Sequence, residues 1–374
     1  MMTLRSAGLA LVSCVGIAVA SIAHATVQVS VTNLVSDDAA FQPAQIIDPG
    51  LVNAWGISYS ETSPFWVSSN GAGTSTLYRV DPLTQATTKV ALTVAIPGAG
   101  NPTGQVFNAG GATQFGGNAF LFVSEDGTLS GWRGALGSTA ESLAGLSAIY
   151  KGAAYANVAG SSYLYAADFH NATINVFKGS AAAPALAGAF LDPTLPQGFA
   201  PFNVQSLGGS LYVAYAKQDP NSPDEVAGAG LGYVDQFDTQ GRFVARVAGG
   251  GTLNAPWGLA LAPDSFGAWG GALLVGNFGD GRISAYDAHT HSFLGQLSTA
   301  TGQPLSIDGL WGLSVGNGGG AGSSHALYFS AGPGDELHGL FGVLQAVPEP
   351  APVALLAAGL MILLLRRSRE RHPT

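Results

Sequence analysis

The sequence contains only one cysteine, Cys14, among 374 residues. A chain with a single thiol has no internal disulfide framework and no cysteine pair for a zinc site. Cys14 also falls within an N-terminal stretch that reads as a leader peptide. The folded body is therefore expected to have no thiol, which excludes a cysteine nucleophile there.

Charged residues are also scarce, at 10% of the chain, and the formal net charge is −9. Nucleic-acid binding needs a basic face, so this composition excludes DNA and RNA as partners. An acidic balance suits an extracytoplasmic protein that meets cations or neutral sugars. There is no Walker phosphate loop and no HExxH motif, and no catalytic residue is assigned.

Glycine, by contrast, is abundant, with 53 residues, and hydrophobic residues make up 47% of the chain. Short apolar runs alternate with clusters of Gly, Asn, Asp and Pro. Such clusters are typical of tight turns between short strands. The pattern therefore predicts an all-β fold.

A sequence repeat organises the body of the chain. Its clearest copies are NAWGIS at 53–58, APWGLA at 255–260 and GLWGLS at 309–314. Weaker copies lie between them at 102–106, 151–154 and 201–205, which gives a period of roughly fifty residues. Each copy is followed by an apolar run, a polar turn and a further strand. Strand–turn–strand units at this spacing predict the blades of a β-propeller.

Six copies predict a six-bladed β-propeller over residues 26–346. Only three strands of the sixth blade precede the C-terminal tail. Residues 27–35 begin with the alternation of apolar and polar residues that is typical of a strand. We expect this N-terminal strand to complete blade 6 and close the ring. The repeated tryptophans Trp55, Trp257 and Trp311 are expected to wedge between neighbouring blades, and the glycine after each to permit close approach of the inner strands.

Both ends of the chain look like targeting signals. Residues 1–25 combine Arg5, an apolar stretch and Ala23-His24-Ala25, which predicts a cleaved signal peptide. Residues 347–374 contain Pro348, Glu349 and Pro350, an apolar run at 351–365 and an arginine-rich end. This run predicts a transmembrane helix with its arginines in the cytoplasm. An ordinary C-terminal anchor is the alternative interpretation.

The C-terminal tail resembles the PEP-CTERM sorting signal of Gram-negative bacteria. That resemblance implies processing by an exosortase-type enzyme. The chain would be held in the inner membrane by the C-terminal helix before processing, and would then lie at the cell surface or outside the cell. Residues 33–81, with NLVSD, IIDPGLVNAWGIS and FWVSSNGAGTSTLYRVD, resemble an exported bacterial propeller family without assigned activity. That family is distantly similar to NHL-repeat and gluconolactonase-type propellers.

The repeat also predicts which side chains gather at one end of the propeller channel. Turns that precede inner strands and turns that follow second strands share one face. The candidate ligand or metal residues there are Asn53, Glu125, Asp168, His170, Asn254, Asn277 and Asp308. Their oxygen atoms suit Ca²⁺ or another divalent cation. The alternative is that each is a turn former.

Two functions follow from these observations. The first is a non-catalytic binding or scaffold protein of the cell envelope or extracellular matrix, with extracellular polysaccharide or envelope proteins as partners. The second is a metal-dependent hydrolase or lactonase with a divalent cation in the channel, which the resemblance to gluconolactonase-type enzymes implies.

Overall fold

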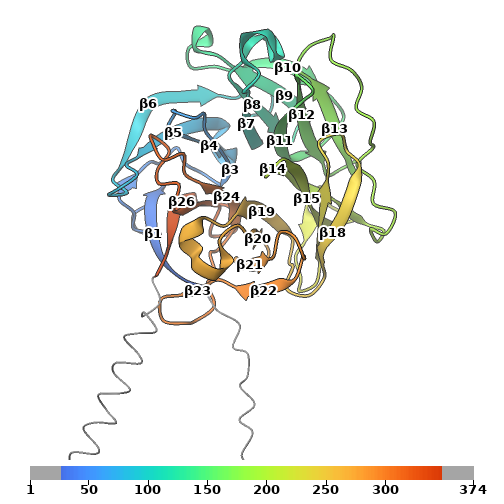
Figure 1. The fold of residues 1–374 in the computed structure, drawn as a ribbon. Helices are drawn as coiled ribbons and strands as arrows, with labels where there is room; N and C mark the ends of the chain where they lie inside the picture. Colours follow the sequence, from blue (N-terminus) through green and yellow to red (C-terminus); the bar gives the residue numbers. More distant parts are fainter. Residues whose placement is uncertain (1–26, 348–374) are drawn as a thin grey trace, which may run out of the picture.

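A computed structural model describes residues 27–347, which form a ring of six β-sheets around a central axis (Figure 1). This confirms the all-β, six-bladed β-propeller. Helix in this part of the chain is confined to five 3₁₀ turns: η1 (Asn70–Ala72), η2 (Gly111–Thr113), η3 (Phe115–Gly117), η4 (Gly134–Leu136) and η5 (Asp264–Trp269).

The blades follow one another in chain order, and in each the strands run outward from the axis. Blade 1 contains β3 (Ala54–Ser58), β4 (Phe65–Ser69), β5 (Thr74–Val80) and β6 (Thr87–Ala95). Blade 2 contains β7 (Pro102–Phe107), β8 (Phe120–Ser124), β9 (Thr128–Trp132) and β10 (Glu141–Gly145). Blade 3 contains β11 (Tyr150–Val158), β12 (Ser161–Asp168) and β13 (Thr173–Lys178).

The remaining blades complete the ring. Blade 4 contains β14 (Phe199–Leu207), β15 (Ser210–Gln218), β17 (Gly232–Phe237) and β18 (Phe243–Gly249), with β16 (Glu225–Val226) paired to β15. Blade 5 contains β19 (Pro256–Leu261), β20 (Leu273–Asn277), β21 (Ile283–Tyr286) and β22 (Phe293–Gln296). Blade 6 contains β24 (Leu310–Val315), β25 (Leu327–Ala331), β26 (Leu340–Ala346) and β1 (Gln28–Ser36), flanked by β2 (Ile46–Ile47) and β23 (Ser298–Thr299).

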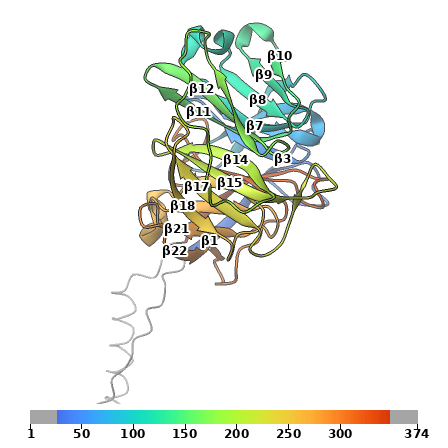
Figure 2. The same ribbon diagram turned by 90° about the vertical axis from the view of Figure 1, so that its right-hand side faces the viewer.

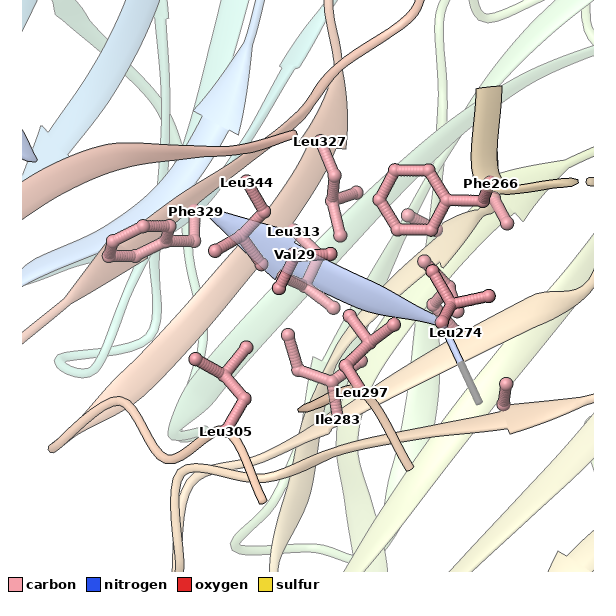
Figure 3. Packing of buried hydrophobic residues seen from close by; sticks show 14 of the residues in the cluster. Val29, Phe266, Leu274, Ile283, Leu297, Leu305, Leu313, Leu327, Phe329 and Leu344 are labelled. Carbon is pink, nitrogen blue, oxygen red and sulfur yellow. The ribbon is translucent and has the colours of Figure 1, made fainter. Parts of the chain in front are cut away.

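The N-terminal strand closes the ring, as the sequence predicts. β1 runs antiparallel to β26, in a register that extends from Val29 opposite Ala346 to Ser36 opposite Leu340. Val29 is 1% exposed and belongs to the apolar cluster between blades 5 and 6 (Figure 3). Blade 6 therefore joins the two ends of the described chain through main-chain hydrogen bonds and a shared core.

Blade 3 differs from the expected four-stranded pattern, because it has three strands. Residues 179–198 leave it as a loop that runs to the outer part of blade 4 (Figure 2). Main-chain bonds from Gly188 and Phe190 to the β17–β18 turn hold this loop, and Asp192 forms an ion pair with Arg246 of β18. The loop contains three prolines, which cannot donate ladder hydrogen bonds, and this explains why no fourth strand forms.

The inner strands pack so closely that their repeated glycine position has no room for a side chain. A Cβ on Gly56 would lie 2.4 Å from the Thr103 carbonyl oxygen, and one on Gly312 would lie 2.7 Å from the Trp55 oxygen. Asn203 of blade 4 occupies the same repeat position, and its amide donates to the Trp257 carbonyl oxygen at 2.8 Å. The expected close approach of inner strands is confirmed.

The predicted terminal signals lie outside the described residues. These are the signal peptide at 1–25 and the sorting tail, including Pro348, Glu349, Pro350 and the apolar run 351–365. Between residues 27 and 347, no helix is long and apolar enough to cross a membrane.

Candidate functional site at the front mouth of the channel

The inner strands all begin at one end of the channel, which we call the front mouth, and finish at the other, the back mouth. The residue just before each glycine position lies near the front mouth, and we call this place in the inner strand the axial position. Going round from blade 1 to blade 6, these residues are Trp55, Thr103, Lys151, Phe202, Trp257 and Trp311. Together they determine what fills this end of the channel.

Aromatic rings close the channel. Trp55 and Trp311 stack at 3.6 Å between ring centres, and Trp257 meets both edge-on at about 6 Å. Phe278 of blade 5 stacks on Trp311 at 4.0 Å, and Phe202 packs beside it. We call this group the aromatic plug.

The plug corrects the expected position of the tryptophans. Trp257 of blade 5 donates from Nε1 to the Lys151 carbonyl oxygen of blade 3, and these blades are not neighbours. The three tryptophans therefore meet across the axis instead of wedging between adjacent blades. They are at most 4% exposed, so they are core and offer no face for sugar stacking.

Lys151 is the one charged residue at the axial positions. Its side chain is 2% exposed, and its Nζ lies 5.4 Å from the centre of the Trp55 ring. The ammonium donates to Glu125 Oε1 at 2.7 Å and to Asp224 Oδ1 at 3.3 Å. A buried ammonium needs such partners, because burial without them is costly.

These contacts extend into a chain of hydrogen bonds across the front mouth, which we call the polar chain. It runs from Glu336 in blade 6 to Asn53 and Asn70 in blade 1, then to Glu125 in blade 2. Lys151 in blade 3 and Asp224 in blade 4 complete it. These hydrogen bonds link five of the six blades. Asn53 also accepts a bond from Trp311 Nε1 at 3.0 Å, which connects the polar chain to the aromatic plug below it.

Burial perturbs the ionisation of several groups here. Burial alone lowers the pKa of Lys151, but the carboxylates of Glu125, Glu225 and Asp224 outweigh it and hold this pKa above its usual value. Burial raises the pKa of Glu225 to about 7, although Lys151 opposes the shift. Burial also raises the pKa of Glu336, although the hydrogen bond from Asn53 and the charge of Lys151 both lower it. The charge of Glu336 also raises the pKa of Glu225, and the charges of Glu125 and Asp224 raise the pKa of Glu336, so negative charge is crowded at this mouth.

The polar chain is interrupted at blade 5, where a pocket of about 290 Å³ opens. We call it the blade-5 pocket. Phe278 forms its aromatic wall, and three acidic residues line it: Asp308, Asp335 and Glu336. No lysine, arginine or histidine lines it. Asp335 and Glu336 both have left-handed backbone conformations, with φ of 55° and 64°, which are uncommon for residues other than glycine.

A second pocket, of about 420 Å³, lies on the same face between blades 3 and 4. His170 and Asp219 line it, together with Lys217 and Gln218. Gln218 bridges the two blades by donating to the Phe169 carbonyl oxygen at 2.5 Å. The structure therefore places His170 at a pocket, but away from the polar chain.

The predicted site residues take different positions. Asn53 and Glu125 join the polar chain, and Asp308 lines the blade-5 pocket. His170 lines the second pocket. The other three act as turn formers. Asp168 accepts bonds from the Ile149 and Asn171 amides, Asn254 accepts from Gly228, and Asn277 bonds to Asn254 and Thr252.

Sequence reasoning missed Lys151, Asp224, Glu225 and Glu336. One signal for Lys151 was present, because the repeat alignment puts it where three other blades have tryptophan. A lysine at an axial position must find carboxylates nearby. No comparable signal marks the three acidic residues, which lie on loops or on a two-residue strand.

The metal expectation gains no direct support from the geometry. Among residues 27–347, no group of three or more His, Cys, Asp or Glu side chains is arranged to hold a metal ion. Glu125 and Asp224 are already paired with the Lys151 ammonium, which lies where a metal ion would have to bind these two carboxylates. Binding of Ca²⁺ or another divalent cation therefore stays a prediction.

The fold and these axial residues define the class as a six-bladed β-propeller with a plugged channel. No family model matches the chain. An uncharacterized protein of Acanthamoeba polyphaga mimivirus is 34% identical over 284 residues, covering 71% of this chain and 69% of the relative. A second uncharacterized mimivirus protein is 32% identical over 326 residues, covering 79% and 81%. The chain belongs to the family of these mimivirus proteins.

These relatives are viral, so they give no support to a bacterial family or to a PEP-CTERM signal. Two solved structures are also similar. The WD40 β-propeller domain of Doa1 shares 10% identity at a TM-score of 0.45, covering 78% of this chain and 92% of that one. A streptogramin B lyase shares 11% identity at a TM-score of 0.47, covering 87% and 100%. Neither similarity bears on the chemistry of this chain.

Proposed function

We propose that this protein is an exported binding protein of the cell envelope or extracellular matrix, and that its ligand presents an organic ammonium group to the blade-5 pocket. The partners we propose are extracellular polysaccharides and envelope proteins that carry such groups. Sorting by an exosortase-type enzyme, through Pro348, Glu349 and Pro350, is part of this proposal.

The observation that carries the proposal is the composition of the blade-5 pocket. An ammonium ion is attracted by carboxylates and by the face of an aromatic ring. The pocket contains three carboxylates, those of Asp308, Asp335 and Glu336, and one aromatic ring, that of Phe278. The one buried ammonium nearby, that of Lys151, is already bonded to Glu125 and Asp224 on the opposite side of the mouth.

Electrostatics support the same ligand class. The raised pKa values of Glu225 and Glu336 reflect buried carboxyl groups without enough compensating positive charge. A cationic ligand between blades 4 and 6 would supply that charge. It would also continue the polar chain across the gap at blade 5.

Calorimetric titration of the full-length protein with tetramethylammonium chloride tests the proposal. We expect one binding site, weakened by Asp308→Asn. Asp280→Asn is the matched control, since this turn carboxylate lies near the same mouth but does not line the pocket. Absence of heat with the wild-type protein, or equal weakening by both variants, would count against the proposal.

A metal-dependent hydrolase or lactonase is the second candidate function. The observation that favours it is the pKa of about 7 at Glu225, which suits a general acid or base near neutral pH. This candidate requires tight binding of Ca²⁺ in the same calorimeter and hydrolysis of a simple lactone. It also requires that Glu225→Gln abolish the hydrolysis.

A further inference from the structure

The back mouth of the channel holds another pocket, formed where the inner strands finish. It measures about 290 Å³, and five of the six blades contribute to it. The aromatic plug separates it from the front mouth, because the space left between the inner strands at mid-channel is only about 10 Å³. One water at most fits in such a space, so the two mouths are independent.

The chemistry of this pocket is opposite to that of the front mouth. Not one of its lining residues is charged. Tyr59, Phe107 and Tyr155 supply aromatic rings, and Ser206 and Gln205 supply a hydroxyl and an amide group. Apolar walls with a few placed polar groups are typical of small-molecule pockets.

Two polar side chains of the wall are open to a ligand. Gln205 and Ser206, near the end of β14, are only partly buried and line the pocket. Ser58 also lines it, but its Oγ is fully enclosed. The amide and the hydroxyl of β14 are therefore the groups that a ligand can contact.

We propose that the back mouth binds one neutral sugar unit. A sugar presents hydroxyl groups to Ser206 and Gln205 and an apolar ring face to the aromatic side chains. An anionic sugar would enter without any basic residue to meet it, and a cationic one without any carboxylate. The uncharged lining therefore selects neutral sugars.

This site is separate from the proposed function, since it lies at the other end of the channel and uses none of the same residues. Either proposal can fail while the other stands. Two sources of a neutral sugar unit are a free monosaccharide and the end of a glycan chain. Both present the same chemistry.

Calorimetric titration of the full-length protein tests the inference. The probes are glucose, galactose, N-acetylglucosamine and the tetrasaccharides of cellulose, starch and chitin, with tetragalacturonic acid as the charged comparison. We expect one site for at least one neutral probe and none for the acid. Equal binding of monosaccharide and tetrasaccharide identifies a single-unit site, whereas tighter binding of the tetrasaccharide identifies a chain-end site.

Gln205→Ala should weaken this binding about five- to tenfold, which corresponds to one lost hydrogen bond. Its melting temperature should stay near that of wild type, because Gln205 is only partly buried. Gln240→Ala is the matched control, as a partly buried glutamine outside the pocket, and should bind as wild type. Ser206→Ala provides a second test at the pocket wall.

The inference is overturned if no neutral probe binds, or if Gln205→Ala and Ser206→Ala both bind as wild type. It is also overturned if Asp308→Asn abolishes sugar binding, because that result places the sugar at the front mouth.

Discussion

Lys151 Nζ lies 2.7 Å from Glu125 Oε1, in a position where its side chain is 2% exposed. This contact joins blades 2 and 3 directly above the aromatic plug. It is the central link of the polar chain, since Asn70 bonds to the other oxygen of Glu125 at 3.0 Å and Asp224 bonds to Lys151.

Replacing Lys151 with methionine should therefore destabilise the fold. The methionine keeps the length of the side chain but leaves Glu125 and Asp224 without their cation. Glu125 and Asp224 are 26% and 62% exposed, so water partly replaces the lost partner, and we expect a cost of about 1–3 kcal/mol, as for hydrogen bonds to charged groups. Urea unfolding of the two proteins measures the loss. Lys217→Met is the control, because the Lys217 ammonium bonds only to a carbonyl at the surface. Equal losses of unfolding free energy in both variants would show that the polar chain does not stabilise the fold.

Stability should depend on pH through Glu225. Its pKa is raised to about 7 in the fold and is about 4.3 in the unfolded chain. The folded state thus favours the protonated carboxyl. This contribution is complete below the unfolded pKa and is lost as the pH rises through about 7.

Glu225→Gln mimics the protonated form. We expect this variant to melt at a higher temperature than wild type at pH 8 and at a similar temperature at pH 4. Glu61→Gln, at an exposed residue, should show no such difference. Melting temperatures of both proteins, measured from pH 4 to pH 8, test this expectation. A stabilisation by Glu225→Gln that does not change with pH would contradict the raised pKa of Glu225.

The glycine position of the inner strands makes a separate prediction. Gly56→Ala places a methyl group 2.4 Å from the Thr103 oxygen. Because that atom belongs to a neighbouring inner strand, the strands must separate, at a cost of roughly 1–3 kcal/mol. Gly145→Ala in β10 is the control, since no atom lies within 4 Å of its added methyl. Similar unfolding curves for the two variants would contradict the close packing.

The sequence predicted most of the architecture because the blades repeat. The apolar run that follows the first repeat copy lies in β4, and the N-terminal strand pairs with β26 as expected. Each of those predictions rests on local alternation of apolar residues and turns. The three-stranded blade 3 departs from the repeat where its prolines interrupt the pattern.

The site was less predictable. Asn53 precedes an inner strand and Asp168 ends a second strand, and both were expected at the same mouth, yet Asn53 bonds to Glu336 while Asp168 caps its own turn. The difference depends on where distant loops fold. Glu336 reaches the mouth from a left-handed backbone conformation. Glycine or asparagine at this position would have signalled that conformation, but the residue is a glutamate.

Closure by β1 can be tested by deletion. Removal of residues 27–36 takes away the outer strand of blade 6 and exposes the edge of β26. An open edge of this kind pairs with other chains. We expect size-exclusion chromatography to show oligomers, or circular dichroism to show an unfolded chain. Deletion of residues 2–25 leaves β1 in place and serves as control. A monomer that lacks β1 and keeps the wild-type melting temperature would contradict ring closure.

The most direct test of the account is a crystal structure of the protein soaked in tetramethylammonium chloride. The account predicts density for the ion in the blade-5 pocket, against Phe278 and between Asp308 and Glu336, with Lys151 still bonded to Glu125. An empty blade-5 pocket in crystals that bind the ion elsewhere, or Lys151 turned away from Glu125, would contradict it.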